Sequence, residues 1–562
     1  MATTSVLKFG SSVLASPDAL STVVHTVYRH LRAGERVVAV VSALDGATDR
    51  LARLARSVHD PGSPAADRAH ARLLATGELQ SVALLGLALE RAGLPATLLD
   101  AGSLQLRTRG TPLDAEPVSV DREALTQALD ATGLVVVPGF VGRAADGSVS
   151  VLGRGGSDLT AVFLAAELGA DCVLYKDVDG LYERDPKIPG PAPGRYARLS
   201  WADAQELDAC IVQPRAIAEA ARRRLRFRVA APGCPAVSVV GGACTEVEDP
   251  HAITRPLRVT LLGLGTVGGG VCAELLARPD DFDVVAAAVR GPGRYADHPL
   301  GPRIHASARA ALAVDTDVVV ELMGGVSAGE AVEAALRRGR HVVTANKALL
   351  AQDGPRLRGV AAAHGVSLLG SASVGGALPA LETASRLRGV TTGFAGVLNG
   401  TCNHVLDAVG RGVPFADAVR AAQAAGFAEA DPSADLDGLD AAHKLVLLAR
   451  ACFGAEPLAS LSVTGIRGLA GPPPGRVWRL VARCRRTDGA LHGSVRPEAL
   501  PARHALADVR GAGNRLVFTT PAGTVSIGAQ GAGRWPTTES VFADLLDLLH
   551  GRRTPVRRRR AS

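Results

Sequence analysis

Aromatic side chains are scarce in this chain of 562 residues, where Phe, Trp and Tyr together account for only 3%. Proteins that stack nucleic-acid bases on exposed rings need such side chains, so that class is disfavoured. Long apolar runs are also missing, and the N-terminus lacks the basic and apolar regions of a signal peptide. The sequence thus predicts a cytoplasmic protein that binds neither nucleic acid nor a membrane.

Cysteine clusters and a strong excess of charge are absent as well. The eight cysteines are scattered without a C-x-x-C spacing, which predicts neither a zinc site nor a disulfide framework. The net charge is +7, but six arginines lie within the last eleven residues, so the rest of the chain is nearly neutral. Residues 546–562 are therefore interpreted as a solvated basic tail.

Lysine is the rarest of the charged residues, since 57 of the 62 basic residues are arginine. Arginine replaces lysine easily on a solvated surface, but not where a compact ammonium must meet a phosphate or exchange a proton. Each remaining lysine is therefore a candidate for chemistry, with chance survival an equal alternative at positions 176 and 187. The five are Lys8, Lys176, Lys187, Lys347 and Lys444.

Two halves follow one another along the chain, and 47% hydrophobic residues suffice for several cores. In each half short apolar strands alternate with helical segments, which predicts α/β units with mostly parallel sheets. A polar, proline-ended stretch without helical period separates them. The expected divisions are 1–240 for the first domain, 241–256 for a linker, 257–370 for a dinucleotide-binding domain, 371–545 for a substrate domain and 546–562 for the tail.

A glycine-rich loop opens the second half. The apolar stretch Leu257–Leu262 runs into G-x-G-x-x-G, and a helical pattern follows through Leu276. Glycine at these positions lets the backbone approach a pyrophosphate at a helix N-terminus. The expected cofactor-binding residues are Gly263, Gly265, Thr266, Val267 and Gly268.

Arg290 stands where an acidic residue would accept the ribose 2′-hydroxyl of NAD. An arginine there can pair with a 2′-phosphate instead, which favours NADP; an ordinary exposed arginine is nearly as good an interpretation. Further on, Asp440 and Lys444 stand four apart in an otherwise apolar helical segment. We interpret them as functional, with a surface i,i+4 pair as the alternative.

Residues 257–460 resemble homoserine dehydrogenases through six motifs in order: the glycine loop, E-L-M-G-G, V-V-T-A-N-K, A-S-V-G-G, G-V-L-N-G-T and G-F-A-E-A-D-P with its downstream D-x-x-H-K. The resemblance implies a Rossmann domain with an α+β substrate domain, and hydride transfer between NAD(P) and the aspartate semialdehyde/homoserine pair. It also implies a homo-oligomer, a dimer or tetramer.

The same resemblance assigns roles. Lys444 is implied as proton donor to the aldehyde oxygen, with Asp440 and Lys347 at the same centre. Thr344 is implied at the cofactor, Glu429 at the substrate ammonium and Asp435 in the same pocket. A monovalent cation, Na⁺ or K⁺, is implied on main-chain oxygens of Val374, Gly376 and Leu378, although Ser371 stands where the family usually has glutamate.

The first half carries phosphate-binding patterns. Val6–Ser12 is a strand that enters a turn of small residues with Lys8, and Leu152-Gly-Arg154-Gly-Gly-Ser157-Asp158 opens a helix. Backbone N–H groups, an ammonium and a helix N-terminus form an anion cradle, and Arg154 can hold a carboxylate at two points.

These segments resemble aspartate kinases of the amino acid kinase family over about residues 5–240: K-F-G-S-S, V-V-S-A, G-E, P-G-F, G-R-G-G-S-D and D-V-D-G-L-Y. The resemblance implies MgATP-dependent phosphorylation of the β-carboxylate of L-aspartate, with Lys8 and Asp158 at the phosphoryl group. The aspartate site would comprise Ser42, Thr48, Glu78, Arg154 and Ser157. The nucleotide site would comprise Asp177, Tyr182 and Lys187.

Two departures bear on the first half. A late lysine expected to reach ATP is absent from Asp208-Ala-Cys210, and Lys176 replaces the usual threonine before D-V-D-G. A dehydrogenase with a degenerate kinase-like scaffold is thus the main alternative, and an NADPH-binding regulatory protein a weaker one. Between residues 232 and 257 the chain is too short for paired regulatory ACT domains, so feedback through such domains is expected to be absent.

Overall fold

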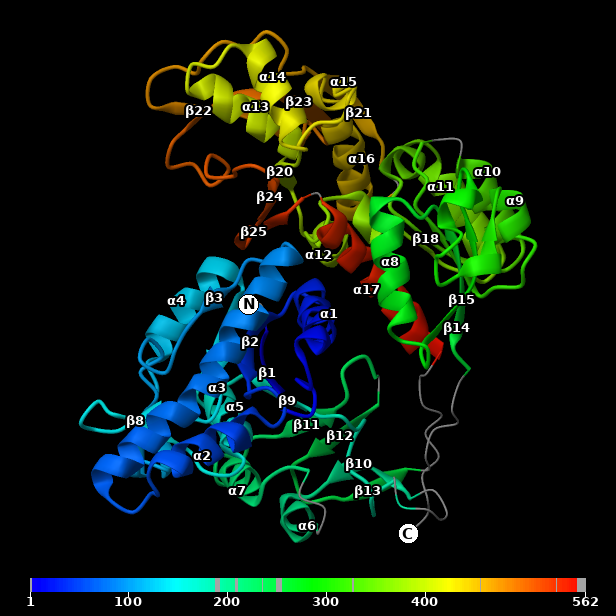
Figure 1. Cartoon of the computed structure of the whole chain (residues 1–562). Helices are drawn as coiled ribbons and strands as arrows, with labels where there is room; N and C mark the ends of the chain where they lie inside the picture. Colours follow the sequence, from blue (N-terminus) through cyan, green and yellow to red (C-terminus); the bar gives the residue numbers. More distant parts are fainter. Residues whose placement is uncertain are drawn as a thin grey trace. The chain divides into compact units, whose positions relative to one another are not determined.

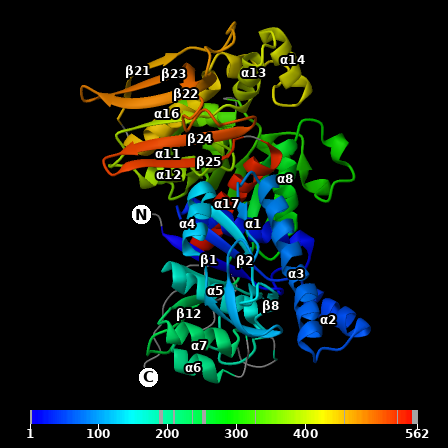
Figure 2. The same cartoon turned by 90° about the vertical axis from the view of Figure 1, so that its left-hand side faces the viewer.

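The computed structural model describes residues 3–186, 188, 193–207, 211–234, 236–248, 255–325, 328–454, 456–531 and 533–552. The chain divides into two compact units (Figures 1 and 2). Unit 1 comprises Met1–Arg91, Pro95–Thr254 and His550–Ser562, and unit 2 comprises Ala92–Leu94 and Arg255–Leu549.

Unit 1 is built on a nine-stranded sheet in the order β13-β10-β12-β11-β9-β1-β2-β6-β3. The central strands β9, β1, β2 and β6 are parallel, as their mostly apolar sequences predict for strands covered on both faces. The strands are β1 (Thr4–Phe9), β2 (Arg36–Val41), β3 (Thr97–Leu98), β6 (Leu134–Pro138), β9 (Asp171–Tyr175), β10 (Arg195–Leu199), β11 (Phe227–Ala230), β12 (Val237–Val240) and β13 (Glu246–Glu248). A smaller sheet, β5-β4-β7-β8, comprises β4 (Arg107–Thr111), β5 (Asp114–Ser119), β7 (Val141–Arg143) and β8 (Val149–Val151).

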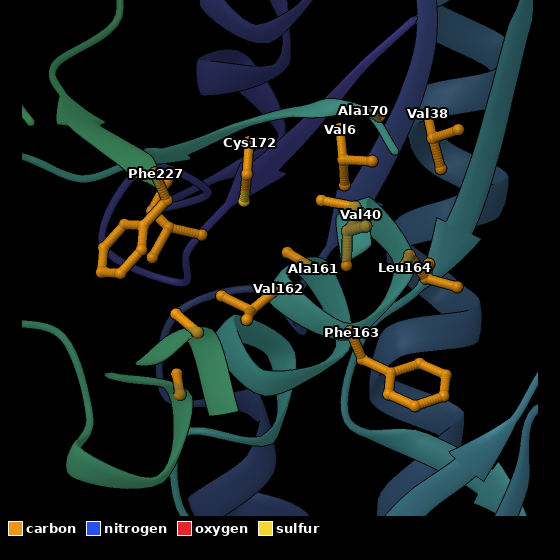
Figure 3. Close-up of a cluster of buried hydrophobic side chains, with 14 of the residues drawn as sticks. Val6, Val38, Val40, Ala161, Val162, Phe163, Leu164, Ala170, Cys172 and Phe227 are labelled. Carbon is orange, nitrogen blue, oxygen red and sulfur yellow. The ribbon is translucent and has the colours of Figure 1, made fainter. Parts of the chain in front are cut away.

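Helix α5 (Gly156–Leu168) lies at the centre of the core of unit 1. Its first ten residues are all buried, because its sequence is apolar on every side. Val6 and Val40 of the sheet pack in one cluster with Ala161 and Val162 of the helix (Figure 3). This packing fixes the N-terminus of α5 beside the ends of β1 and β9. The other helices are α1 (Leu20–Arg32), α2 (Ala47–Val58), α3 (Pro64–Arg91), α4 (Arg122–Thr132), α6 (Trp201–Glu206) and α7 (Pro214–Arg222).

Among the described helices, α3 alone is long and apolar enough to span a membrane by length and composition. It packs instead against α1, α2, β6 and β8, and it buries Glu78 and His70 within unit 1. A core helix passes the same test, so α3 is a core helix of this unit.

Unit 2 contains a six-stranded parallel sheet in the order β16-β15-β14-β17-β18-β19. Its strands are β14 (Leu257–Leu262), β15 (Phe282–Ala288), β16 (Ile304–His305), β17 (Val318–Glu321), β18 (His341–Thr344) and β19 (Leu368–Leu369). The accompanying helices are α8 (Thr266–Leu276), α9 (Ala308–Ala311), α10 (Gly329–Arg337) and α11 (Lys347–Ala363). Strand order and connections are those of a Rossmann dinucleotide-binding domain.

A second six-stranded sheet of unit 2 has the order β21-β23-β22-β20-β24-β25 and is antiparallel apart from the β21–β23 pair. Its strands are β20 (Gly393–Val397), β21 (Leu458–Val463), β22 (Arg476–Thr487), β23 (Ala490–Pro501), β24 (Gly513–Thr520) and β25 (Gly523–Gln530). The helices of this part are α12 (Ala380–Arg386), α13 (Gly400–Gly410), α14 (Phe415–Ala424), α15 (Ser433–Leu436) and α16 (Leu439–Phe453). The α/β class expected from the sequence is confirmed in both units.

The structure differs from the sequence-based divisions at two places. Glu246–Glu248, expected in the linker, forms β13, which pairs antiparallel with β10 at the edge of the sheet of unit 1. Helix α17 (Arg534–Arg552) continues into the stretch that was expected to be a basic tail. Its Leu546 and Leu549 are buried in the core of the Rossmann domain, so this helix covers the dinucleotide-binding sheet rather than completing the substrate domain alone.

Candidate active sites

The first candidate site is a cavity of about 520 Å³ in unit 1. The end of β1, the start of α5 and the end of β9 converge there, because β1 and β9 are parallel neighbours. Of the predicted kinase residues, the cavity is lined by Lys8, Ser42, Thr48, Glu78, Arg154, Ser157 and Asp158.

Two ammonium groups hold the carboxylate of Asp158. Lys8 Nζ lies 2.7 Å from Oδ1 and Lys176 Nζ lies 2.8 Å from Oδ2. Burial raises the pKa of Asp158, but the two positive charges outweigh this and hold the pKa below its ordinary value. Burial lowers the pKa of Lys8 to about 8, although Asp158 opposes the shift. Asp158 is therefore ionised at neutral pH and Lys8 is largely protonated.

Glu78 lies on α3 and is 3% exposed. Its Oε1 accepts a hydrogen bond of 3.2 Å from the backbone N–H of Ala43. Its Oε2 has no hydrogen-bond partner among the described residues. Burial raises the pKa of Glu78 to about 8, so an unliganded cavity holds this carboxyl mainly in its neutral form at pH 7.

Two of the predicted nucleotide residues, Asp177 and Tyr182, are not among the residues that line this cavity. Asp177 follows β9 and is exposed. Tyr182 is half-buried, and its hydroxyl donates a hydrogen bond of 2.6 Å to Asp179, which together with burial raises the pKa of the phenol. Lys187 and the segment Asp208–Cys210 lie outside the described residues.

The second candidate site lies in unit 2 and begins at the glycine loop between β14 and α8. A Cβ at Gly268 would lie 2.1 Å from the carbonyl oxygen of Gly263, so only glycine fits there. A Cβ at Gly265 would meet nothing within 4 Å, and Thr266 beside it is exposed, whereas Val267 is half-buried. The loop is therefore an open cradle at a helix N-terminus, which fits the pyrophosphate of a dinucleotide.

The edge of the sheet that carries this loop is held together by Glu321, which the sequence analysis missed. This fully buried carboxylate accepts hydrogen bonds from the backbone N–H groups of Met323 and Gly324, at 2.8 and 3.0 Å. Thr344 donates its hydroxyl to the other oxygen at 2.6 Å. The side chain of Thr344 thus supports Glu321 and the turn at Met323 and Gly324. The main chain of Thr344 is then the part that can contact a cofactor. Arg290, two residues beyond β15, is exposed.

Asp440 is the centre of a second charge cluster. Its Oδ1 lies 2.6 Å from Lys347 Nζ and its Oδ2 lies 2.8 Å from Lys444 Nζ. Lys444 also donates a hydrogen bond of 2.6 Å to the carbonyl of Leu398 and is 10% exposed, whereas Lys347 is 41% exposed. The sequence motifs placed these three residues at one centre, and the structure brings them together from α11 and α16.

The electrostatics of this cluster favour the charged forms of Asp440 and Lys347. Burial raises the pKa of Asp440, but Lys444 and Lys347 outweigh it and the pKa is strongly lowered. Burial lowers the pKa of Lys347, but Asp440, with help from Asp435 and Glu429, raises it above its ordinary value. Glu429 itself is exposed.

Asn399 and Thr401 are further residues that the sequence analysis did not assign. Asn399 donates one amide hydrogen to Asp435 at 2.7 Å and the other to Asp440 at 2.9 Å. Thr401 donates its hydroxyl to the carbonyl of Phe427 at 2.6 Å and lies 3.0 Å from the second oxygen of Asp435. The available signal was the polar N-G-T at the end of an apolar strand.

The loop expected to carry a cation runs through Val374, Gly376 and Leu378. The carbonyl of Leu378 already accepts a hydrogen bond of 2.7 Å from Ala380. Although Ser371 lacks a carboxylate, its hydroxyl donates a hydrogen bond of 2.6 Å to Asp544 of α17. Asp544 thus brings a carboxylate to Ser371, the position where the family usually has glutamate.

The comparisons with known proteins agree with this division. A model described as the NAD-binding domain of homoserine dehydrogenase matches residues 263–370, one described as homoserine dehydrogenase matches 380–546, and one for the amino acid kinase family matches 3–230. The chain therefore joins a kinase-type domain to a dinucleotide-dependent dehydrogenase.

Individual relatives make the assignment narrower. A homoserine dehydrogenase of Synechocystis is 35% identical over 318 residues, which are 52% of this chain and 73% of that protein. The structure of a homoserine dehydrogenase from Thiobacillus denitrificans is 34% identical, with a TM-score of 0.50 over 53% of this chain and 74% of that chain. The chain belongs to the homoserine dehydrogenase family.

The kinase half has relatives of its own. An aspartate kinase of Pseudomonas putida is 35% identical over 228 residues, 40% of this chain, and the chain spans 54% of that protein's length. Both kinds of domain are thus present, which favours the bifunctional interpretation over a dehydrogenase with a degenerate kinase-like scaffold.

Proposed function

We propose that this protein is a bifunctional enzyme that phosphorylates the β-carboxylate of L-aspartate with MgATP and reduces aspartate 4-semialdehyde to L-homoserine. The observation that carries the reductase is Asp440 held between two ammonium groups, of which Lys347 follows β18 in the same parallel sheet that carries the dinucleotide cradle after β14. For the kinase it is the Lys8–Asp158 pair in a cavity that also holds a neutral carboxyl.

Reduction of an aldehyde produces an alkoxide that must be stabilised and protonated. Lys444 and Lys347 are the ammonium groups that can do both, and Asp440 holds both of them in place. Asp435, fixed by Asn399 and Thr401, and the exposed Glu429 supply negative charge for the substrate ammonium.

A nicotinamide dinucleotide bound at the glycine loop would supply the hydride. Gly263, Gly265 and Gly268 shape the loop, and the N-terminus of α8 faces the pyrophosphate position. Gly263 also donates a backbone hydrogen bond to Ala288, so the end of β15, and with it Arg290, lies near this loop. The nearby positive charge supports a preference for NADP over NAD.

Phosphoryl transfer depends on placement and charge neutralisation rather than on covalent catalysis. Lys8 and the N-terminus of α5 supply positive charge, and Asp158 orients Lys8. Ser42, Thr48, Arg154, Ser157 and Glu78 surround the space that aspartate would occupy. A substrate ammonium beside Glu78 would convert that neutral carboxyl to its charged form.

Both activities are tested on one preparation, as aspartate-dependent ADP release from MgATP and as NADPH-dependent reduction of the semialdehyde. Lys444→Met should lower the reductase turnover at least about 100-fold, leave the affinity for NADPH nearly unchanged and leave ADP release intact. Lys8→Met should lower ADP release by a similar factor and leave the reductase turnover intact. Because each variant is the control for the other, unchanged turnover in either would remove that lysine from the chemistry, and no ADP release from the wild type would contradict the kinase.

A monovalent cation is proposed at the carbonyl groups of Val374 and Gly376, with the carboxylate of Asp544 compensating for Ser371. Reductase activity should then be higher in KCl or NaCl than in choline chloride at equal ionic strength. Asp544→Asn should weaken this dependence, and equal activity in all three salts would contradict the site.

A further inference from the structure

Lys176 carries a function that the motif comparison did not assign. Its position is occupied by threonine in the pattern that this segment otherwise follows, and it is one of only five lysines in the chain. It is 8% exposed, which is unusual for a lysine unless the ammonium has a partner. A buried ammonium at this place therefore needs a reason.

The register of the sheet explains how Lys176 reaches the site. Lys8 on β1 lies opposite Leu174 on β9. Residues two apart in a strand share a face, so Lys176 follows Leu174 on the face that carries Lys8. Its backbone N–H still pairs with Ala230 of β11, at 2.9 Å, so the strand geometry extends to this residue.

Lys176 contacts both carboxylate oxygens of Asp158, including the one that Lys8 contacts. Its Nζ lies 2.8 Å from Oδ2 and 3.0 Å from Oδ1, while Lys8 takes Oδ1 at 2.7 Å. Both lysines line the cavity. One carboxylate is thus shared by two ammonium groups at the N-terminus of a helix, and the cluster keeps a net positive charge.

The other charged residues of the cavity also favour an anionic ligand. Arg154 and Arg56 add positive charge at the lining, and Glu78 is mainly neutral at pH 7 because burial raises its pKa to about 8. A ligand with several negative charges is therefore required to balance the site. Lys176 adds an ammonium where a phosphoryl group would lie if Lys8 binds one.

We propose that Lys176 is a second catalytic ammonium of the kinase site, in contact with the phosphoryl group as it passes from ATP to aspartate. The inference rests on the proposed kinase function and deepens it. A β-carboxylate oxygen of aspartate attacks the γ-phosphorus, the bond from that phosphorus to the bridging oxygen breaks, and its electron pair remains on ADP. No proton moves, so Lys176 keeps its charge throughout and neutralises the oxygens of the transferring group.

This role also explains how a kinase of this composition compensates for a missing charge. The segment 208–210, where the motif comparison leads one to expect an ATP-binding lysine, contains none. Lys176, which follows β9, supplies an ammonium group in place of that missing lysine. Arginine at position 176 would keep the charge but would exchange a compact ammonium for a wide planar fork.

The test uses the full-length protein and the variants Lys176→Met and Lys176→Arg. Lys176→Met should lower the turnover of aspartate-dependent ADP release about 100-fold or more, with the KM for aspartate changed less than threefold. Lys176→Arg should recover at least a tenth of the wild-type turnover. The affinity for MgADP with aspartate and aluminium fluoride, which mimics the transferring group, should fall about as much as turnover, while the affinity for MgADP alone should not.

The outcomes separate the inference from the proposed function. If the wild type releases ADP and Lys176→Met does so at an undiminished rate, Lys176 has only a packing role and the inference is wrong. Equal losses of affinity for MgADP with and without aluminium fluoride would also overturn it, since that result indicates a damaged fold. A wild type that releases no ADP would overturn the kinase function itself, and this inference with it.

Discussion

Asn399 donates one hydrogen of its side-chain amide to Oδ2 of Asp440 at 2.9 Å, and its other hydrogen goes to Asp435 at 2.7 Å. Its Oδ1 accepts the backbone N–H of Cys402, so the amide is fully used and its orientation is fixed. One uncharged side chain therefore bridges the two acids of the candidate site.

Asn399→Asp should lower kcat/KM of the reductase about 100-fold at pH 8, because a third carboxylate replaces two donors. The loss should shrink as the pH is lowered, since a protonated aspartic acid can again donate one hydrogen bond. The pH profile of this variant relative to the wild type provides the measurement.

Asn403 offers a matched control on the same helix. It is fully buried and donates its amide to the carbonyls of Gly511 and Gly513, away from both acids. Asn403→Leu should lower the melting temperature but leave the shape of the pH profile unchanged. If both variants lose activity equally at every pH, Asn399 has a structural role only.

Asp440→Asn should move the alkaline limit of the reductase to lower pH. In the wild type Asp440 raises the pKa of Lys347 above its ordinary value against the effect of burial. Without the carboxylate, only the weaker effects of Asp435 and Glu429 oppose burial, so that pKa falls and the ammonium is lost at a lower pH. The pH dependence of kcat/KM should show the fall at least about one unit earlier. If kcat/KM of the variant falls at the same alkaline pH as that of the wild type, Lys347 is not required in its charged form.

Glu78 should release a proton when aspartate binds. With a pKa of about 8 in the unliganded cavity, this carboxyl is mainly protonated at pH 7. A substrate ammonium favours its ionised form, so binding should release nearly one proton at pH 7 and almost none at pH 9. Calorimetric titration in buffers of different ionisation enthalpy measures this number. Glu78→Gln should abolish the buffer dependence; a wild type without it would contradict contact with the ammonium.

The strands and the main motif positions could be predicted from the sequence, because they depend on local pattern. The apolar run Leu257–Leu262, for example, forms β14 with the expected bounds. The i,i+4 pair Asp440 and Lys444 is likewise fixed by helical period alone.

Contacts between distant segments could not be predicted in this way. Asp544 contacts Ser371, which lies 173 residues earlier in the chain. Lys176, which directly follows β9, contacts Asp158 near the start of α5. The last residues of helix α17, from position 546 on, were assigned to a basic tail because the arginines follow there, yet Leu546 and Leu549 pack in the Rossmann core. A Cβ at Gly270 of α8 would lie 2.5 Å from Thr538 of α17, so this close helix contact depends on one glycine that no motif marks.

Two glycines of the dinucleotide loop, Gly265 and Gly268, distinguish contact with the ligand from the fit of the backbone. Gly265 has an extended backbone and open space at its Cβ position, so Gly265→Ala should leave the melting temperature unchanged. If a pyrophosphate approaches this backbone, the added methyl group should weaken NADPH binding at least about tenfold. At Gly268 a Cβ would lie 2.1 Å from a carbonyl oxygen, so Gly268→Ala should lose both stability and binding.

Gly269 is the matched control, because a Cβ there would lie 3.8 Å from the nearest atom and the residue is within α8. Gly269→Ala should raise the free energy of unfolding by up to about 1 kcal/mol, since alanine favours the helix, and it should leave NADPH affinity unchanged. Fluorescence titration with NADPH and thermal unfolding of the three variants give the comparison. If Gly265→Ala binds NADPH as tightly as Gly269→Ala does, the dinucleotide does not approach this loop, and the cofactor site must be sought elsewhere on the sheet edge.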